Sequence, residues 1–284
     1  MSNRSEAEVV CSVRLAIGGD RDALESVVVH IQTDVYNLAV RMLWCPDDAA
    51  DATQEILMKV VTRLASFRGD SAFRTWVYRI AANHLLDVRR SRVERERLTF
   101  SSFGESLRNG ASDPPAGWES DPEQRLLLEE VKIGCTTAML LCLTRDERIA
   151  YILGDVFEFS SDEAAAVLSV SAAAFRQRLS RARAALRAFM AAECGLVADA
   201  APCRCRRRVR AAVATGRARA DRPLFMLREP SAARELPVIS GVDEMDELHR
   251  IAGIFRSHPT YQAPGALLDA VRGALASGRY SIVL

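Results

Sequence analysis

One stretch of the chain mixes aromatic rings with arginines. Residues 67–92 read FRGDSAFRTWVYRIAANHLLDVRRSR and place Phe73, Trp76 and Tyr78 among arginines, although aromatics make up only 6% of the protein. Aromatic faces stack on unpaired bases and guanidinium groups bind phosphates, so this pattern suits a separated nucleic-acid strand. The alternative is an ordinary amphipathic helix whose rings belong to the core.

Helical spacing separates these side chains into faces. We expect Ser71 to cap a helix that runs from residue 72 to about residue 92. One face is apolar and should pack inward: Phe73, Val77, Ile80, Ala81, His84 and Val88. A second face carries Arg79, Asn83 and Arg90 with Trp76 at its edge, and Tyr78 falls on a third. By this count Trp76 and Tyr78 suit a structural role as well as a binding one.

A second basic stretch has the pattern of a helix-turn-helix. Residues 160–186 read SSDEAAAVLSVSAAAFRQRLSRARAAL, in which Ser160 or Ser161 caps one short helix and Ser171 caps the next. Two short helices joined tightly, the second strongly basic, are typical of major-groove readers, although Ser169 stands where the turn often has glycine. The early residues of the second helix would face bases: Ser171, Ala172, Ala173, Phe175 and Arg176. The later arginines would contact phosphates: Arg178, Arg181 and Arg183. A solvated basic helix on an unrelated bundle is the alternative for this segment alone.

Three closely spaced cysteines follow that helix. Cys194, Cys203 and Cys205 suggest a zinc site, which normally needs four ligands, with the fourth supplied by His249, by His258 or by no residue. The alternatives are a redox-responsive thiol pair, favoured by the neighbouring arginines, and inert cysteines. We assign Cys45, Cys135 and Cys142 to helix packing.

Helical periodicity recurs along the chain, and strand-like alternation is scarce. We expect helices near residues 20–43, 49–65, 72–92, 122–142, 144–154, 160–168, 171–194, 244–255 and 264–276. Residues 94–121 are rich in Ser, Gly, Pro and charge, which indicates a flexible linker. The fold class is therefore all-α, with two small helical domains joined by a linker and a mostly helical C-terminal extension.

Composition limits the class of protein. The 284 residues carry a net charge of only +1, so any basic patch is local. The N-terminus lacks a secretory pattern, and no apolar run reaches the roughly 20 residues of a membrane span. We expect a cytoplasmic protein without membrane insertion, whose seven cysteines are reduced thiols or metal ligands.

The two basic stretches together resemble a known family. Asp51-Ala52-Thr53-Gln54-Glu55 followed by residues 67–92 resembles domain 2 of bacterial RNA polymerase sigma factors, and the extracytoplasmic-function (ECF) group is the most similar. LTRDERIAYILGDVFEFSSDEAAAVLSVSAAAFRQRLSRARAAL resembles domain 4 of that group. The resemblance implies domain 2 at residues 8–93, a linker at 94–121, domain 4 at 122–192 and an extension at 193–284 with no assigned role.

The resemblance also implies partners and sites. Asp51, Gln54 and Glu55 match the docking site for the β′ coiled coil of core polymerase, and domain 4 implies contact with the β flap. The loop of Phe67, Arg68, Gly69, Asp70 and Ser71 matches one that captures a flipped base of the −10 element. Trp76, Arg79, Asn83 and Arg90 match the helix that melts and holds that element, and the helix from Ser171 matches the −35 reader. An anti-sigma partner, or self-regulation by the extension, is a further expectation.

Two other classes of function explain less. A stand-alone helix-turn-helix repressor or activator would leave the aromatic–arginine helix and the acidic Asp51/Glu55 face without a role. An enzyme with a cysteine-bound catalytic zinc would need a catalytic constellation, and the sequence has no paired carboxylates, nucleophile–base arrangement or phosphate-binding glycine loop. We therefore interpret the chain as a non-enzymatic sigma factor that needs no cofactor, apart from the zinc considered above.

Overall fold

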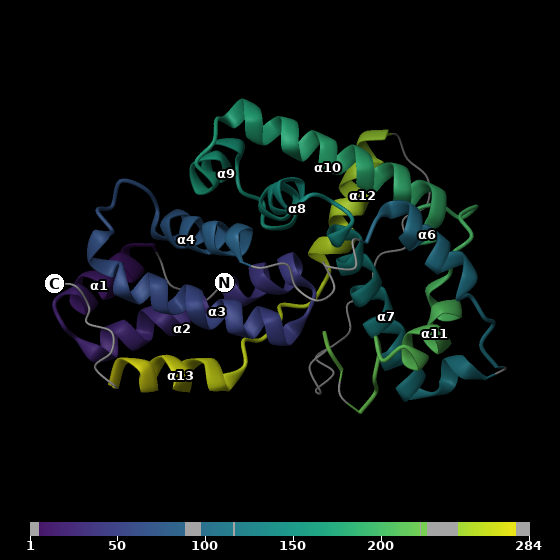
Figure 1. The fold of residues 1–284 in the computed structure, drawn as a ribbon, viewed down its shortest axis with the longest axis horizontal. Coiled ribbons are helices and arrows are strands. Elements are labelled where there is room, and N and C mark those ends of the chain that lie inside the picture. Colours follow the sequence, from purple (N-terminus) through teal and green to yellow (C-terminus); the bar gives the residue numbers. More distant parts are fainter. Residues whose placement is uncertain (1–5, 89–97, 116, 222, 226–243, 277–284) are drawn as a thin grey trace. The chain divides into compact units, whose positions relative to one another are not determined.

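The structure is a computed structural model that describes residues 6–88, 98–115, 117–221, 223–225 and 244–276. All regular elements among these residues are helices (Figure 1), which confirms the expected all-α class. The chain forms two compact units that each combine separate stretches of sequence. Unit 1 draws on residues 1–91, 160–175 and 260–284, and unit 2 on residues 92–159 and 176–259.

Unit 1 is built around two long helices. Asp20 starts α2 by accepting a hydrogen bond from the Ala23 backbone N–H at 3.0 Å, and the helix ends at Trp44, whose φ of 64° reverses the chain. Pro46 then occupies the first turn of α3, where its missing N–H removes no intrahelical bond. The elements of this unit are α1 (Glu6–Ile17), α2 (Arg21–Leu43), α3 (Pro46–Thr62), η1 (Leu64–Ser66), α4 (Phe73–Asp87), α9 (Ser161–Leu168) and α13 (Gly265–Ala276).

The core of unit 1 lies between α2, α3 and α4. Leu38 of α2, Ile56 of α3 and Phe73 of α4 are all at most 1% exposed. Burial of such apolar surface is the main stabilising contribution to a bundle of this size. The C-terminal helix α13 packs on α2 and α3 (Figure 1) and buries Leu267 and Val271.

Unit 2 contains the remaining helices. α10 begins in unit 1 and continues into unit 2. A capping box of Thr144 and Glu147 starts α8, which runs directly into a π-helical turn. The elements are α6 (Phe100–Asn109), η2 (Trp118–Ser120), α7 (Pro122–Leu141), α8 (Arg145–Tyr151), η3 (Ile152–Val156), α10 (Ala172–Glu193), η4 (Cys205–Arg208), α11 (Val209–Ala214) and α12 (Glu244–Arg256).

The stretch expected to be a linker contains a helix. α6 is started by a capping box in which Thr99 and Ser102 exchange side-chain and backbone hydrogen bonds. Phe103 and Leu107 lie on its buried face, and the Phe103 ring stacks on Phe189 of α10 at 5.7 Å. The expectation of an irregular linker was wrong here because apolar residues at i and i+4 outweigh the Ser- and Gly-rich composition.

The C-terminal extension packs against unit 2 through α12. The Phe255 ring meets Tyr151 edge-on at 5.3 Å, and the Arg256 guanidinium pairs with Glu158 at 3.0 Å. Earlier in the extension, the backbone N–H groups of Leu224 and Phe225 donate hydrogen bonds to the buried carboxylate of Glu130 on α7. The expected closing helices are confirmed as α12 and α13.

Candidate nucleic-acid interface

A cluster of three rings supports the loop before α4. The Phe67 ring centroid lies 5.2 Å from Phe73 and 5.6 Å from Trp76, and Phe73 and Trp76 stack at 5.8 Å. Phe73 is buried as expected, whereas Phe67 and Trp76 are half-buried. Between these rings the loop exposes Arg68, Gly69 and Asp70, and Gly69 adopts a φ of 79° that suits glycine. The rings thus form a base for an exposed polar loop.

The start of α4 differs from the expectation. Ser71 was predicted to cap the helix, but the structure places Ala72 at the cap, without a side-chain hydrogen bond. Glu6 of α1 accepts a hydrogen bond from the Phe73 backbone N–H instead, at 2.7 Å. A carboxylate from a distant segment therefore replaces the local hydroxyl, and it also lies favourably near the positive end of the helix dipole.

The structure separates the roles of Trp76 and Tyr78. Tyr78 is only 4% exposed, with the Arg74 guanidinium 5.4 Å from its ring centroid, and burial raises the pKa of its phenol. It is therefore a core residue, so the structure favours the structural one of the two roles that the sequence left open for Tyr78. Trp76 keeps part of its ring accessible beside the loop. Helical periodicity could not show which of the two rings is buried, because Trp76 and Tyr78 both lie beside the apolar stripe.

The polar face of α4 is only partly exposed. Asn83 is exposed, whereas Arg79 is half-buried and donates from Nε to the Ala166 carbonyl of α9 at 3.0 Å. Contact between α9 and α4 is extensive within unit 1. Arg90 lies outside the described residues. In the arrangement described, the Asn83 side chain is accessible, whereas the Arg79 Nε is occupied by a hydrogen bond.

The acidic face of α3 is accessible. Asp51 and Glu55 are exposed and Gln54 is half-buried. Behind this face lies His84, which is buried as expected and lies 3.6 Å from the Glu55 carboxylate through Nε2. The Lys59 ammonium donates to His84 Nδ1 at 2.6 Å. Burial and the nearby Lys59 charge lower the pKa of His84, so the imidazole is neutral.

The helix-turn-helix is capped at both helices. Ser160 and Glu163 form a capping box at the start of α9, and the Ser171 hydroxyl accepts from the Ala174 N–H at 3.1 Å. Between the helices Ser169 adopts φ 55°, ψ 42°, the left-handed conformation that glycine adopts more easily. The predicted caps are confirmed, and Ser169 takes the conformation of the missing glycine at a cost in strain.

The residues predicted to read the −35 element divide into exposed and structural ones. Ser171, Ala173, Arg176 and Arg181 are exposed, and Ala172 and Arg178 are half-buried. Phe175 is 0% exposed, so its assignment as a base contact was wrong. Sequence reasoning also missed Gln177, which is exposed beside Arg176. The pattern of arginines along the helix gave no signal for a glutamine.

Acidic side chains hold several of the later arginines. Arg183 binds Asp155 through two hydrogen bonds, Nε to Oδ2 at 2.9 Å and an Nη to Oδ1 at 2.6 Å. This pairing raises the pKa of Arg183 and joins α10 to η3. Arg178 lies 3.3 Å from Asp146, and Arg181 lies 4.0 Å from Glu147. Arg183 is therefore a structural residue rather than a free phosphate contact.

The segments that carry the three C-terminal cysteines meet α7, the helix that carries Cys135. Cys194 and Cys203 lie opposite each other in a parallel backbone bridge, and Cys205 begins η4, which packs on the helix that carries Cys135. Neither histidine proposed as a fourth ligand joins them: His249 is exposed on α12, and His258 Nε2 is hydrogen-bonded to Thr136 at 2.7 Å. Within the described residues, no three His, Cys, Asp or Glu side chains already form a metal-binding arrangement.

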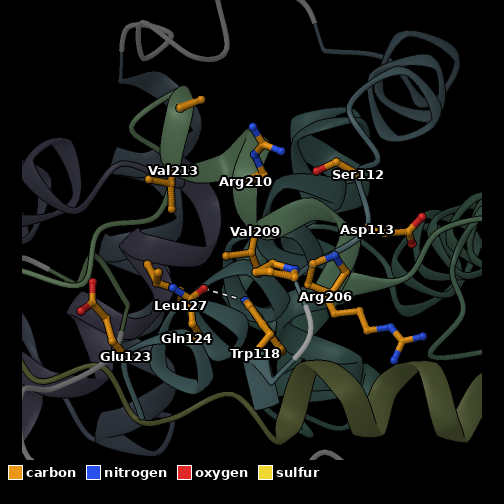
Figure 2. Close-up of a pocket in the computed structure, with 13 residues that line it drawn as sticks. Ser112, Asp113, Trp118, Glu123, Gln124, Leu127, Arg206, Val209, Arg210 and Val213 are labelled. Atoms are coloured by element: carbon orange, nitrogen blue, oxygen red, sulfur yellow. Dashed lines mark hydrogen bonds between the residues drawn. The ribbon is translucent and has the colours of Figure 1, made fainter. Parts of the chain in front are cut away.

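Unit 2 also contains a cavity of about 650 Å³ (Figure 2). Its apolar floor is part of the cluster that joins η2, α7 and α11, and the Trp118 indole donates to Gln124 at 2.6 Å. Arg206 and Arg210 lie among its lining residues. None of the residues considered above for DNA or polymerase lines this cavity.

Known proteins were compared with the chain. Sigma-70 region 2 matches residues 27–95, and Sigma-70 region 4 matches residues 133–186. The RNA polymerase sigma-H factor of Pseudomonas aeruginosa is 31% identical over 176 residues, which are 59% of this chain and 86% of that protein. The ECF RNA polymerase sigma-E factor of Escherichia coli K12 is 34% identical over 171 residues, with the same shares covered. A solved structure of CnrH in complex with the cytosolic domain of CnrY covers 63% of this chain and 95% of that one, with 25% identity and a TM-score of 0.44.

Residues 193–284 lie beyond both family matches. Among the described helices, none is both long and apolar enough to cross a membrane. Two family regions in the expected order, and relatives above 30% identity that are matched over most of their length, identify the family. The chain belongs to the ECF group of RNA polymerase sigma factors, which direct promoter recognition and the initiation of transcription.

Proposed function

We propose that this sigma factor divides promoter recognition among three surfaces. The first is the acidic α3 face of Asp51, Gln54 and Glu55, which docks on the β′ coiled coil of core polymerase. Its exposed carboxylates would repel DNA phosphates, so a protein partner suits this face better than a nucleic acid. The roles of these three residues follow from the family resemblance, and their side chains are exposed or half-buried.

The second surface is the loop from Phe67 to Ser71 together with Trp76 and Asn83. The observation that carries this assignment is the ring cluster, which fixes the exposed Arg68–Gly69–Asp70 loop on a rigid base. Extruding a base from a duplex costs a few kcal/mol, so the receiving site must be held in place before the base arrives. Trp76 is partly accessible beside that site, and Arg79 joins once its hydrogen bond to Ala166 breaks.

The third surface is the early part of α10. Ser171, Ala172, Ala173, Arg176 and Gln177 read the −35 element in the major groove, where an arginine or glutamine forms bidentate hydrogen bonds with a base edge. Arg178 and Arg181 contact phosphates, which fixes the register of the helix. Phe175 and Arg183 support this surface from within the fold.

The protein acts without a catalytic activity of its own, in the cytoplasm where the polymerase and the promoter are found. Contact of region 4 with the β flap, and an anti-sigma partner, remain predictions from the family.

Transcription from a defined template tests the proposal. Purified chain and core polymerase are combined on a promoter duplex and on the same promoter with a pre-melted −10 bubble. Binding to core, followed by initiation on both templates, supports the proposal. Tight duplex binding without core would indicate a stand-alone repressor, and no binding to core would overturn the docking assignment.

A further inference from the structure

The strongest unassigned feature is the group of four thiols at the end of α10. Cys203 donates its backbone N–H to the Glu193 carbonyl at 3.1 Å and accepts from the Gly195 N–H at 3.1 Å. These two bonds bracket Cys194 and hold it directly opposite Cys203. Residues paired in this way point their side chains to the same side of the ladder. Cys194 and Cys203 therefore present their thiols to one region, and both are buried.

The close approach of the two segments depends on Gly195. A Cβ at this position would lie 2.5 Å from the Cys203 carbonyl oxygen, so the segments approach too closely for a side chain here. Arg204 closes the other side of the turn and donates to the carbonyls of Ala201 at 2.5 Å and Cys203 at 3.0 Å. The backbone around the two cysteines is therefore fixed by hydrogen bonds before any ligand binds.

Cys205 and Cys135 lie on two further elements that pack on each other. Cys205 is two residues beyond Cys203 and begins η4, which packs against α7, the helix that carries Cys135. The thiols are close enough for the charge of one, once ionised, to raise the pKa of another: the other three act in this way on Cys135, and Cys194 and Cys203 act in this way on Cys205. Burial raises the pKa of all four thiols, to about 11 for Cys194 and about 12 for Cys205.

We propose that Cys135, Cys194, Cys203 and Cys205 bind one zinc ion as a closed, structural tetrathiolate site. Structural zinc sites have four ligands, and four cysteines are a common set. This assignment replaces the histidine considered as fourth ligand with Cys135, which sequence spacing had placed in helix packing. The ion joins α7, the end of α10 and the following turn. It therefore fixes the C-terminal end of α10, the helix that reads the −35 element.

Zinc capture requires the sulfur atoms to turn toward a common point, because the described residues contain no ready metal-binding group. Each cysteine has a single χ1 torsion with three staggered positions, so its sulfur can move by ångströms without a change in the backbone. Four thiols and Zn²⁺ become Zn(S)₄ with a charge of −2, and four protons are released to solvent. Binding therefore strengthens with rising pH.

Neighbouring cations offset the charge of that complex. Arg208 interacts electrostatically with Cys135 and Cys203, Arg204 with Cys194 and Cys203, and Lys132 with Cys205. These cations, with Arg207 near Cys203, outnumber the two carboxylates that act on the thiols, Glu193 on Cys203 and Glu129 on Cys205. Such an outer shell stabilises metal-bound thiolates. Without metal, the buried protonated thiols are poor nucleophiles, which argues against a rapid redox switch between Cys194 and Cys203.

Metal content and cobalt spectra of the full-length protein test the proposal. Protein purified under reducing conditions should retain about one zinc per chain. Replacement by Co²⁺ should give the d–d bands of a tetrahedral site and the strong near-ultraviolet sulfur-to-cobalt absorption of four thiolates.

Cys135 of α7 and Cys142, which caps the end of that helix, provide a matched comparison. Cys135→Ser should lose the zinc, whereas Cys142→Ser should retain it. Cys135→His supplies a replacement ligand and should restore metal binding with weaker sulfur-to-cobalt absorption, which separates ligation from a folding defect. Absence of bound metal after reconstitution, equal loss in both serine variants, or a non-reduced mass about 2 Da lower from a disulfide would each overturn the proposal.

Discussion

Asn37 of α2 pairs through its side-chain amide with both backbone polar groups of Tyr261. Its Nδ2 donates to the Tyr261 carbonyl at 2.7 Å, and its Oδ1 accepts from the Tyr261 N–H at 3.0 Å. The Arg41 guanidinium lies 4.7 Å from the centroid of the Tyr261 ring. At the far end of the segment, Arg272 Nε donates to Glu25 at 3.2 Å. The side chains of one helix thus hold the C-terminal segment against unit 1.

Loss of the Asn37 amide should release this segment. Asn37→Ala removes both of these hydrogen bonds from the buried backbone of Tyr261, at a cost of about 1–3 kcal/mol. Limited trypsin digestion should then cut at Arg272 at least several-fold faster than in the wild type. Asn83→Ala, which removes an exposed amide from α4, serves as the control and should leave the rate unchanged. An unchanged rate in the Asn37 variant would show that α13 is held by its apolar face alone.

Ser169 should be replaceable by glycine with a gain in stability. Its left-handed backbone, φ 55°, strains a residue that has a Cβ, so Ser169→Gly should raise the free energy of unfolding by about 0.5–1 kcal/mol. Ser180→Gly at an exposed position within α10 should have the opposite sign, because glycine is unfavourable inside helices. Urea denaturation of both variants gives the comparison. A loss of stability in Ser169→Gly would show that the hydroxyl contributes more than the strain costs.

Sequence periodicity predicted most of the helices because their buried stripes and caps are local. It identified Phe73 and His84 as core residues and Ser160 and Ser171 as caps, and the structure agrees in each case. It missed α6, whose capping box is made by Thr99 and Ser102 rather than by the expected Ser/Thr–Glu pair.

Errors at the candidate sites have a common physical origin. Phe175 was given a binding role from its position along the chain, and the role of Tyr78 was left open, but tertiary packing buries both. The partner of Arg183 is Asp155, which is 28 residues away and on another helix. The proposed zinc site adds Cys135, which lies 59 to 70 residues before the other three thiols, so spacing alone could not connect them.

Arg176 and Arg183 should respond differently to truncation. Arg176 is exposed, so Arg176→Ala should weaken holoenzyme binding to a −35 duplex and leave the thermal midpoint unchanged. If Arg176 contacts a phosphate, the plot of log binding constant against log salt concentration should also become shallower, by about one unit of slope. Arg183→Ala leaves the largely buried Asp155 carboxylate unpaired, so it should lower stability by about 1–3 kcal/mol. Equal thermal midpoints for the two variants would contradict the structural role of Arg183.

His84 should make unit 1 sensitive to mild acid. The Lys59 ammonium can only donate, so Nδ1 accepts and the neutral ring carries its proton on Nε2, facing Glu55. Burial and Lys59 lower the pKa in the fold, whereas Glu55 and Asp87 oppose them. The unfolded chain therefore binds a proton at His84 more readily than the folded chain does. The stability that the neutral ring contributes is present above pH about 6.5 and is lost as the pH falls below that value.

Urea denaturation between pH 8 and pH 5 measures this loss. His84→Gln should show a flatter dependence on pH than the wild type, and His249→Gln, at an exposed position, should match the wild type. If the free energy of unfolding of the wild type fell as the pH rose instead of as it fell, the assignment of a neutral ring to folded His84 would be wrong.

Trp76 should matter for promoter opening more than for polymerase binding. Its ring stacks on Phe73 and contacts Phe67, yet remains partly accessible beside the exposed loop, so Trp76→Ala removes a stacking surface without opening the core centre. Base–aromatic stacking contributes about 1–3 kcal/mol, which predicts a 5- to 150-fold loss of open complex on duplex promoter. A pre-melted bubble should recover part of this loss, and the affinity for core should stay within about twofold, because the α3 docking face is untouched. Tyr78→Phe, at a buried ring, should leave opening unchanged. If Trp76→Ala weakened core binding and opening equally, the ring would belong to the structural core of unit 1 rather than to the DNA surface.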